Sequence, residues 1–223
     1  MELRSDESPS DERLKEAIEE LLSGCDERDH GWMGDALRIH IATSNVLSDD
    51  ALGTDAIMIP AFDLDLDSYK RIAEMIHESY NKDRKSEDPS YVPEYPSWKD
   101  LPDTLKISNM CQALHCGDRV HLIGCHLDAD NPSIVEISEN EIEKMSVLEH
   151  ERWVLERRSN GWRYGRIKNV TEKRSPYLVP WGDLPEEIRE YDREAVRNMI
   201  PILKSLGIGI SVIETHSQDA HKP

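Results

Sequence analysis

The sequence carries one pattern twice, in the same order and with similar spacing. The first copy reads Trp98-Lys-Asp-Leu-Pro-Asp-Thr-Leu-Lys106, and the second reads Trp181-Gly-Asp-Leu-Pro-Glu-Glu-Ile-Arg189. A second shared block precedes each copy: His77-Glu78-Ser-Tyr80 with Arg84, and His150-Glu151-Arg-Trp153 with Arg157. Internal repeats dictate an architecture, because each copy folds as one structural unit. The chain is therefore predicted to contain a duplicated half-domain of about 70 residues.

The second unit has the clearer local signals. Ser138 and Glu141 form a predicted capping box, which marks the start of a helix. The expected elements are a helix over 138–159, a turn-rich segment with short strands or hairpin turns over 161–181, a helix from Pro185 that Pro201 kinks or restarts, and a strand over 208–213. The second unit is thus predicted to alternate helix and short strand.

The rest of the chain has weaker signals. The expected elements are a helix over 10–22, short strands at Leu37–Ile41 and Ala56–Ile59, a helix over 68–82 and a helix from Pro102 into the Cys116 region. A nucleotide-binding α/β domain is an alternative source of the two short strands, although no glycine-rich turn accompanies them. The polar ends, 1–9 and 214–223, are expected to be loose.

Four segments of the second unit together resemble a known family. They are Glu149-His-Glu-Arg-Trp153, Gly161-Trp-Arg-Tyr-Gly165, Leu178-Val-Pro-Trp-Gly-Asp-Leu-Pro-Glu186 and Tyr191-Asp-Arg193. The combination is similar to the ryanodine-receptor repeat, or RyR domain. The resemblance is strong over 139–212, whereas 68–127 resembles a degenerate copy without the Gly-Trp-x-Tyr-Gly segment.

The resemblance implies an α+β, mostly helical fold in which two helix–strand–helix repeats form a pseudo-twofold pair. The predicted domains are an N-terminal extension over 1–66, a first repeat over 67–128, a second repeat over 137–213 and a flexible tail. Family members occur as paired repeats in large calcium-release channels and as small prokaryotic or phage proteins, and this chain resembles the small type. The resemblance also implies ligand recognition, with nucleotide-like ligands the usual proposal.

Charge is unevenly distributed along this acidic protein. The net charge of −18 argues against general nucleic-acid binding, which depends on neutralising phosphates. Residues 157–174 nevertheless hold seven arginines and lysines against one acidic residue. This basic segment is either a site for a small anion or a solvated surface loop. The sequence has no membrane-length apolar run and no N-terminal signal region, so we expect a soluble, cytoplasmic protein without a membrane partner.

One face of the predicted helix over 139–159 presents imidazole, indole and guanidinium groups together. At about 100° per residue, His150, Trp153 and Arg157 fall within an arc of roughly 60°. In this hypothesis Trp153 stacks on the ligand, Arg157 and Arg166 bind its charge, and His150 and Tyr164 orient it. The candidate ligand-binding residues are His150, Trp153, Arg157, Trp162, Tyr164, Arg166 and Trp181. The alternative is that the aromatic residues form the core, with His150 bonded to the Trp181 turn.

Catalysis, cofactors and metals have little support in the sequence. We expect no enzyme activity and no cofactor, because no nucleophile elbow, P-loop or His-Glu-x-x-His motif is present. Cys111 and His115 stand four residues apart and could share a metal, but no Cys-x-x-Cys spacing supports zinc. We therefore expect no metal site, and buried reduced thiols at Cys116 and Cys125.

The leading hypothesis is non-catalytic recognition of a small anionic, nucleotide-like ligand. The alternative is a module for protein assembly, with a homo-oligomer or another protein as partner and no small-molecule ligand. The shared residues of the two copies are interpreted as the fold. The segment found only in the second copy is where function is expected.

Overall fold

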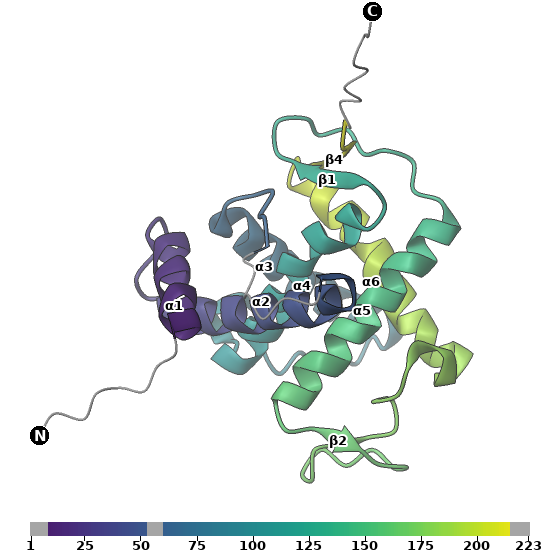
Figure 1. Cartoon of the computed structure of the whole chain (residues 1–223). Helices are drawn as coiled ribbons and strands as arrows, with labels where there is room; N and C mark the ends of the chain where they lie inside the picture. Colours follow the sequence, from purple (N-terminus) through teal and green to yellow (C-terminus); the bar gives the residue numbers. More distant parts are fainter. Residues whose placement is uncertain (1–8, 53–59, 215–223) are drawn as a thin grey trace, which may run out of the picture.

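The computed structural model describes residues 9–52 and 60–214, without the side chains of 9–11 and 47–52. Within these residues helices predominate, joined by two small sheets (Figure 1). The elements are α1 Pro9–Leu22, α2 His30–Leu52, α3 Leu66–Glu87, η1 Trp98–Asp100, α4 Asp103–His121, β1 Cys125–Asp128, α5 Glu139–Ser159, β2 Arg163–Tyr164, β3 Arg174–Ser175, η2 Trp181–Asp183, α6 Glu186–Ser205 and β4 Gly209–Val212. The expected α+β, mostly helical fold class is confirmed.

Two halves of the molecule have the same order of elements. The first half runs α3, η1, α4 and β1, and the second runs α5, η2, α6 and β4. Strands β1 and β4 pair antiparallel, with Cys125 opposite Val212, so one sheet joins the halves. The second half alone carries β2 and β3, a two-residue parallel pair between α5 and η2. In Figure 1 this insertion lies at one end of α5 and the β1–β4 sheet lies beyond the other.

In each half, a histidine of the first helix contacts the loop before the turn that begins with Trp98 or Trp181. His77 Nε2 lies 3.0 Å from the carbonyl oxygen of Tyr95, and His150 Nε2 lies 2.8 Å from that of Val179. Both histidines are buried. These histidines are among the residues that the two sequence copies share, so part of the shared pattern stabilises the fold.

Helix α5 has the predicted bounds and the predicted cap. The Ser138 backbone N–H donates to Glu141 Oε2 at 2.7 Å, and the Glu141 backbone N–H donates to Ser138 Oγ at 3.4 Å. This reciprocal pair satisfies two donors that a helix start leaves open. Helix α6 continues through Pro201 as one element, so of the predicted kink or restart the restart does not occur.

The strand predicted at Leu37–Ile41 is wrong, because this segment lies within helix α2. Its buried side chains recur with helical spacing: Trp32, Met33, Ala36, Leu37, His40 and Ile41. The five-residue window Leu-Arg-Ile-His-Ile alternates like a strand, and only the longer window reveals the helix. Ala56–Ile59 and nearly all of both expected loose ends lie outside the described residues.

The core is centred on α4, which contacts α2, α3, α5 and β1. Its buried apolar residues are Met110, Cys111, Ala113, Leu114, Cys116 and Val120. The predicted burial of Cys116 and Cys125 is confirmed, and all four cysteines are free thiols. None of the described helices is long and apolar enough to cross a membrane.

Candidate ligand-binding cleft

The predicted face of α5 brings three of its side chains together. The His150 and Trp153 rings stack with centroids 5.9 Å apart and planes 22° apart. The Arg157 guanidinium lies 5.7 Å from the Trp153 ring centroid and 5.2 Å from that of Trp162. Arg157 therefore makes cation–π contacts with both indoles.

Among these stacked side chains, His150 is the most deeply buried. It is 2% exposed, and its Nδ1 lies 3.2 Å from Asp192 Oδ2 while Nε2 contacts the Val179 carbonyl. Both partners are acceptors, so the two contacts favour the protonated ring, in which both nitrogens donate. Burial acts to lower the pKa of His150, but Asp192 and the Val179 carbonyl outweigh it and raise the pKa. His150 thus has both nitrogens engaged within the protein.

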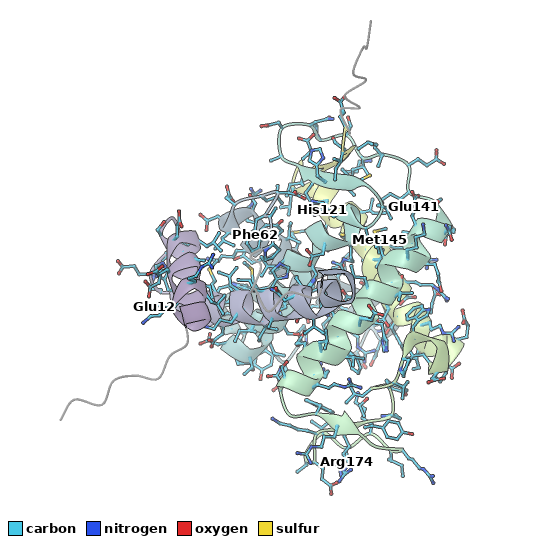
Figure 2. The ribbon with its side chains drawn as sticks, in the orientation of Figure 1. Glu12, Phe62, His121, Glu141, Met145 and Arg174 are labelled. Carbon is cyan, nitrogen blue, oxygen red and sulfur yellow. The ribbon has the colours of Figure 1, made fainter. Side chains whose placement is uncertain are left out.

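Trp181 is likewise engaged by its own half of the molecule. Its indole N–H donates to Glu143 Oε1 at 3.2 Å, and the guanidinium groups of Arg189 and Arg193 lie 5.7 and 5.8 Å from its ring centroid. Tyr164 and Arg166, in contrast, are exposed on the β2–β3 insertion. Figure 2 shows this insertion, labelled at Arg174, projecting beyond the C-terminal end of α5. Of the candidate residues, His150 therefore lies in the interior, Trp181 contacts its own half, and Tyr164 and Arg166 lie on the projecting insertion.

A cleft of about 510 Å³ opens where α2, α4, the end of α5 and the insertion meet. Arg157 and Trp162 line it, together with Arg38 from α2 and Lys173 from the insertion. Its apolar lining consists of Ile39, Leu105 and Ile107. A ligand's planar ring can stack on Trp162 here, and its negative group can contact the arginines and the lysine.

Cationic groups dominate the accessible chemistry of this cleft. No ion pair involves Arg38 or Arg157 among the described residues. Lys173 Nζ donates to the carbonyl oxygen of Asn160 at 2.8 Å, so it keeps further donors. Two carboxylates also line the cleft: Asp35 is one, and the other, Glu156, is held by Arg152 and by Ser108 Oγ at 3.0 Å.

A second hollow, of about 390 Å³, shares Arg157, Leu105 and Ser108 with the cleft. Three tyrosines and two asparagines of the first half line it: Tyr80, Tyr91, Tyr95, Asn81 and Asn109. Aromatic faces and amide groups are the usual partners of a nucleobase. Arg157 therefore stands between a cationic cleft and an aromatic hollow.

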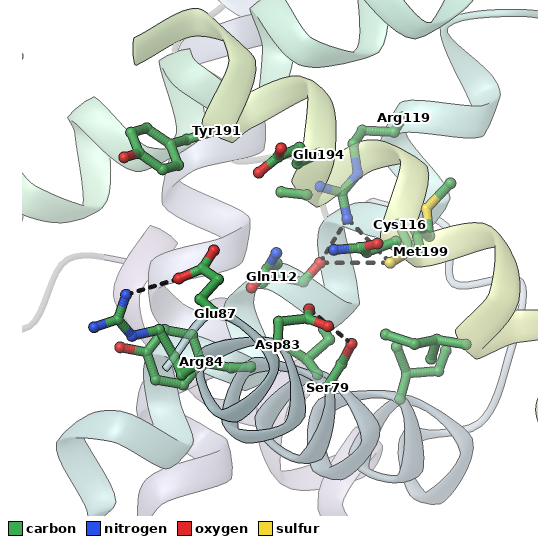
Figure 3. A pocket seen from close by; sticks show the side chains of 16 residues that line it. Ser79, Asp83, Arg84, Glu87, Gln112, Cys116, Arg119, Tyr191, Glu194 and Met199 are labelled. Atoms are coloured by element: carbon green, nitrogen blue, oxygen red, sulfur yellow. Dashed lines mark hydrogen bonds and ion pairs between the residues drawn. The ribbon is translucent and has the colours of Figure 1, made fainter. Parts of the chain in front are cut away.

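A third hollow, of about 370 Å³, lies between α3 and α6 (Figure 3). Its rim carries Asp83, Glu87 and Glu194, and its exposed arginine, Arg84, pairs with Glu87 at 3.0 Å. The acidic rim makes this hollow a poor site for an anion.

A buried charge network beneath the first cleft has no counterpart in the sequence prediction. Arg119 of α4 pairs with Glu149 of α5 at 2.6 Å, and Arg152 pairs with both Glu149 and Glu156. Burial acts to raise the pKa of Glu149, but Arg152 and Arg119 outweigh it and lower the pKa. The spacing of 149, 152 and 156 matches one helix face, which is the signal that could have revealed the network.

Residues 125–212 match the RyR domain family. The matched region runs from β1 to β4 and contains α5, the β2–β3 insertion and α6. It contains Arg157, Trp162 and Lys173, whereas Arg38 and the aromatic hollow lie largely outside it. The match begins before the predicted second repeat at 137 and includes β1, which the sequence prediction assigned to the first repeat.

Proposed function

We propose that this protein recognises a small anionic, nucleotide-like ligand in the cleft beside Arg157, without catalysing a reaction. The observation that carries the proposal is the position of Arg157. It contacts the Trp162 ring and lines a cleft that also holds Arg38 and Lys173. An otherwise strongly acidic chain concentrates positive charge here, which favours an anion.

The two hollows share Arg157, which suggests where the phosphates and the base of a nucleotide would lie. Its phosphates would contact Arg38, Arg157 and Lys173, because guanidinium groups bind phosphate oxygens in pairs. Its base would stack on Trp162 or enter the hollow lined by Tyr91 and Tyr95. Tyr164 and Arg166 would approach from the exposed insertion. His150 and Trp153 would support Arg157 from within α5.

Two further features belong to this proposal. We infer that the first half is a degenerate copy of the repeat found in the second half, since it has the same element order and the equivalent histidine contact. We also infer a cytoplasmic location, which suits the free thiols of Cys111, Cys116 and Cys125.

A thermal-shift screen against mono-, di- and cyclic nucleotides tests the proposal. At least one nucleotide should raise the melting temperature of the wild-type chain, and Arg157→Gln should abolish the shift. Arg158→Gln is the matched control, because Arg158 is the exposed neighbour on the same helix. A flat screen, or an equal loss in both variants, would contradict the proposal.

Protein assembly is the alternative, and the β2–β3 insertion favours it. Ile167 is 81% exposed and Val170 is 66% exposed on this insertion. Two apolar side chains exposed on a projecting loop could be buried against a partner. If the insertion mediates self-association, Ile167→Asp with Val170→Asp should reduce the mass measured by light scattering. A monomeric mass for both the wild-type chain and the double variant would argue against self-association.

A further inference from the structure

Two histidines and one aspartate meet in the interior, where α2 packs on α4. His40 comes from α2, and His115 and Asp118 stand one turn apart on α4. One ligand-type atom from each residue lies within 4.8 Å of the others. The cluster is separate from the anion cleft and lies outside the RyR-matched region.

The two imidazoles are buried with unsatisfied nitrogens. Both histidines are 1% exposed, and among the described residues His40 Nδ1 and His115 Nε2 have no hydrogen-bond partner. His115 Nδ1 lies 2.6 Å from Asp118 Oδ2. Buried polar atoms normally have a partner, and for a cluster of ligand-type atoms a metal ion is a recognised one.

Burial also changes the pKa values of the three side chains. It lowers the pKa of both histidines, that of His40 to about 3. Burial acts to raise the pKa of Asp118, but contacts with His115, His40 and Ser44 outweigh it and lower the pKa to about 2. Neutral imidazole nitrogen and ionised carboxylate oxygen are metal ligands.

We propose that His40, His115 and Asp118 bind a divalent transition metal of the zinc class, which joins α2 to α4. Ligand bonds of about 2.0–2.2 Å in tetrahedral geometry place ligand atoms roughly 3.4 Å apart. His40 Nδ1 and Asp118 Oδ2 are 3.8 Å apart, near this spacing, and the shorter His115–Asp118 contact opens when the ion enters.

A neighbouring side chain would orient the ligating carboxylate. Ser44 Oγ, one turn beyond His40, donates to Asp118 Oδ2 at 3.1 Å. Such an outer hydrogen bond fixes the direction of a ligating carboxylate. Cys111, the partner that the sequence suggested for His115, instead has its Sγ 3.6 Å from the carbonyl oxygen of Ala36. The proposed ion thus has nitrogen and oxygen ligands and no sulfur.

Metal titration of the full chain, after treatment with EDTA and dialysis, tests this site. Calorimetry with Zn²⁺ should give one ion per chain and a higher melting temperature. Co²⁺ should give the visible bands of a four-coordinate ion without thiolate charge transfer. Asp118→Asn and His115→Gln should each weaken Zn²⁺ binding by more than about tenfold. His126→Gln, at a more exposed histidine near Asp128, and Cys111→Ser should bind as the wild type does.

Two measurements keep the test decisive if a variant folds poorly. Circular dichroism of each metal-free variant establishes whether its fold is intact. Imidazole nitrogen resonances of the wild-type chain, recorded with and without Zn²⁺, need no variant and should shift for two buried histidines. The proposal is overturned if the wild type retains no Zn²⁺, if folded Asp118→Asn and His115→Gln bind it normally, or if thiolate charge transfer appears.

Discussion

At the residue scale, His150 shows how one side chain can couple stability to pH. Its two acceptors, the Val179 carbonyl and the Asp192 carboxylate, favour the protonated ring and raise its pKa in the folded state. A raised folded pKa contributes stability that is fully present below the unfolded value of about 6.5. That contribution is lost as pH rises through the folded pKa.

Between about pH 6 and pH 9, replacing His150 with Gln should therefore destabilise the protein most near pH 6 and least near pH 9. The comparison with wild type cancels the opposite dependence of His40 and His115, whose pKa values are lowered. Urea unfolding at each pH measures the difference in unfolding free energy. A difference that stays constant or grows toward pH 9 would show that the folded ring is neutral.

Gly209, the first residue of β4, has no room for a side chain. A Cβ atom there would collide with the backbone carbonyl oxygens of Asn131 and Ser133. Because both obstacles are backbone atoms, Gly209→Ala should destabilise the protein by at least about 1–3 kcal/mol. Gly182→Ala, where a Cβ meets no atom of the described residues within 4 Å, is the control for denaturant unfolding. Equal midpoints for the two variants would contradict the close approach of this loop to β4.

At the element scale, a buried ion pair joins α4 to α5. Arg119→Met leaves Arg152 alone against Glu149 and Glu156 and should cost about 3–5 kcal/mol, because one excess buried negative charge is then uncompensated. Arg28→Met removes an exposed pair with Asp26 and should leave the unfolding midpoint unchanged. Chemical denaturation compares the two. A loss no greater for Arg119→Met than for Arg28→Met would show that the buried pair contributes little.

Local signals predicted some elements well and others poorly. The bounds of α5 followed from its capping box, and β4 followed from alternating apolar residues, because both signals lie within a few residues. Helix α2 was missed in part, because a five-residue window does not distinguish a buried helix from a strand. That error also concealed His40 and Arg38, which α2 places against α4 and the cleft.

At the scale of the whole molecule, the candidate site joins segments far apart in the sequence. The α5 face with Arg157 was predictable from helical spacing. Trp162 was predictable because it lies in the basic segment found only in the second copy. Arg38 and the aromatic hollow of the first half were not, because only packing of the halves and α2 brings them near Arg157. The same packing places His150 and Trp181 in interior contacts, so helical spacing alone overstated their access to a ligand.

The central claim is that a nucleotide-like anion binds beside Arg157 and Trp162. The most direct test is the indole N–H spectrum of the ¹⁵N-labelled chain during titration with nucleotides that raise its melting temperature. The chain has five tryptophans, so single Trp→Phe variants can assign each signal. The account predicts a saturable shift that is largest for Trp162 and absent in Arg157→Gln. Saturable binding that moves other indoles and leaves Trp162 unchanged, or no shift with any nucleotide, would contradict it.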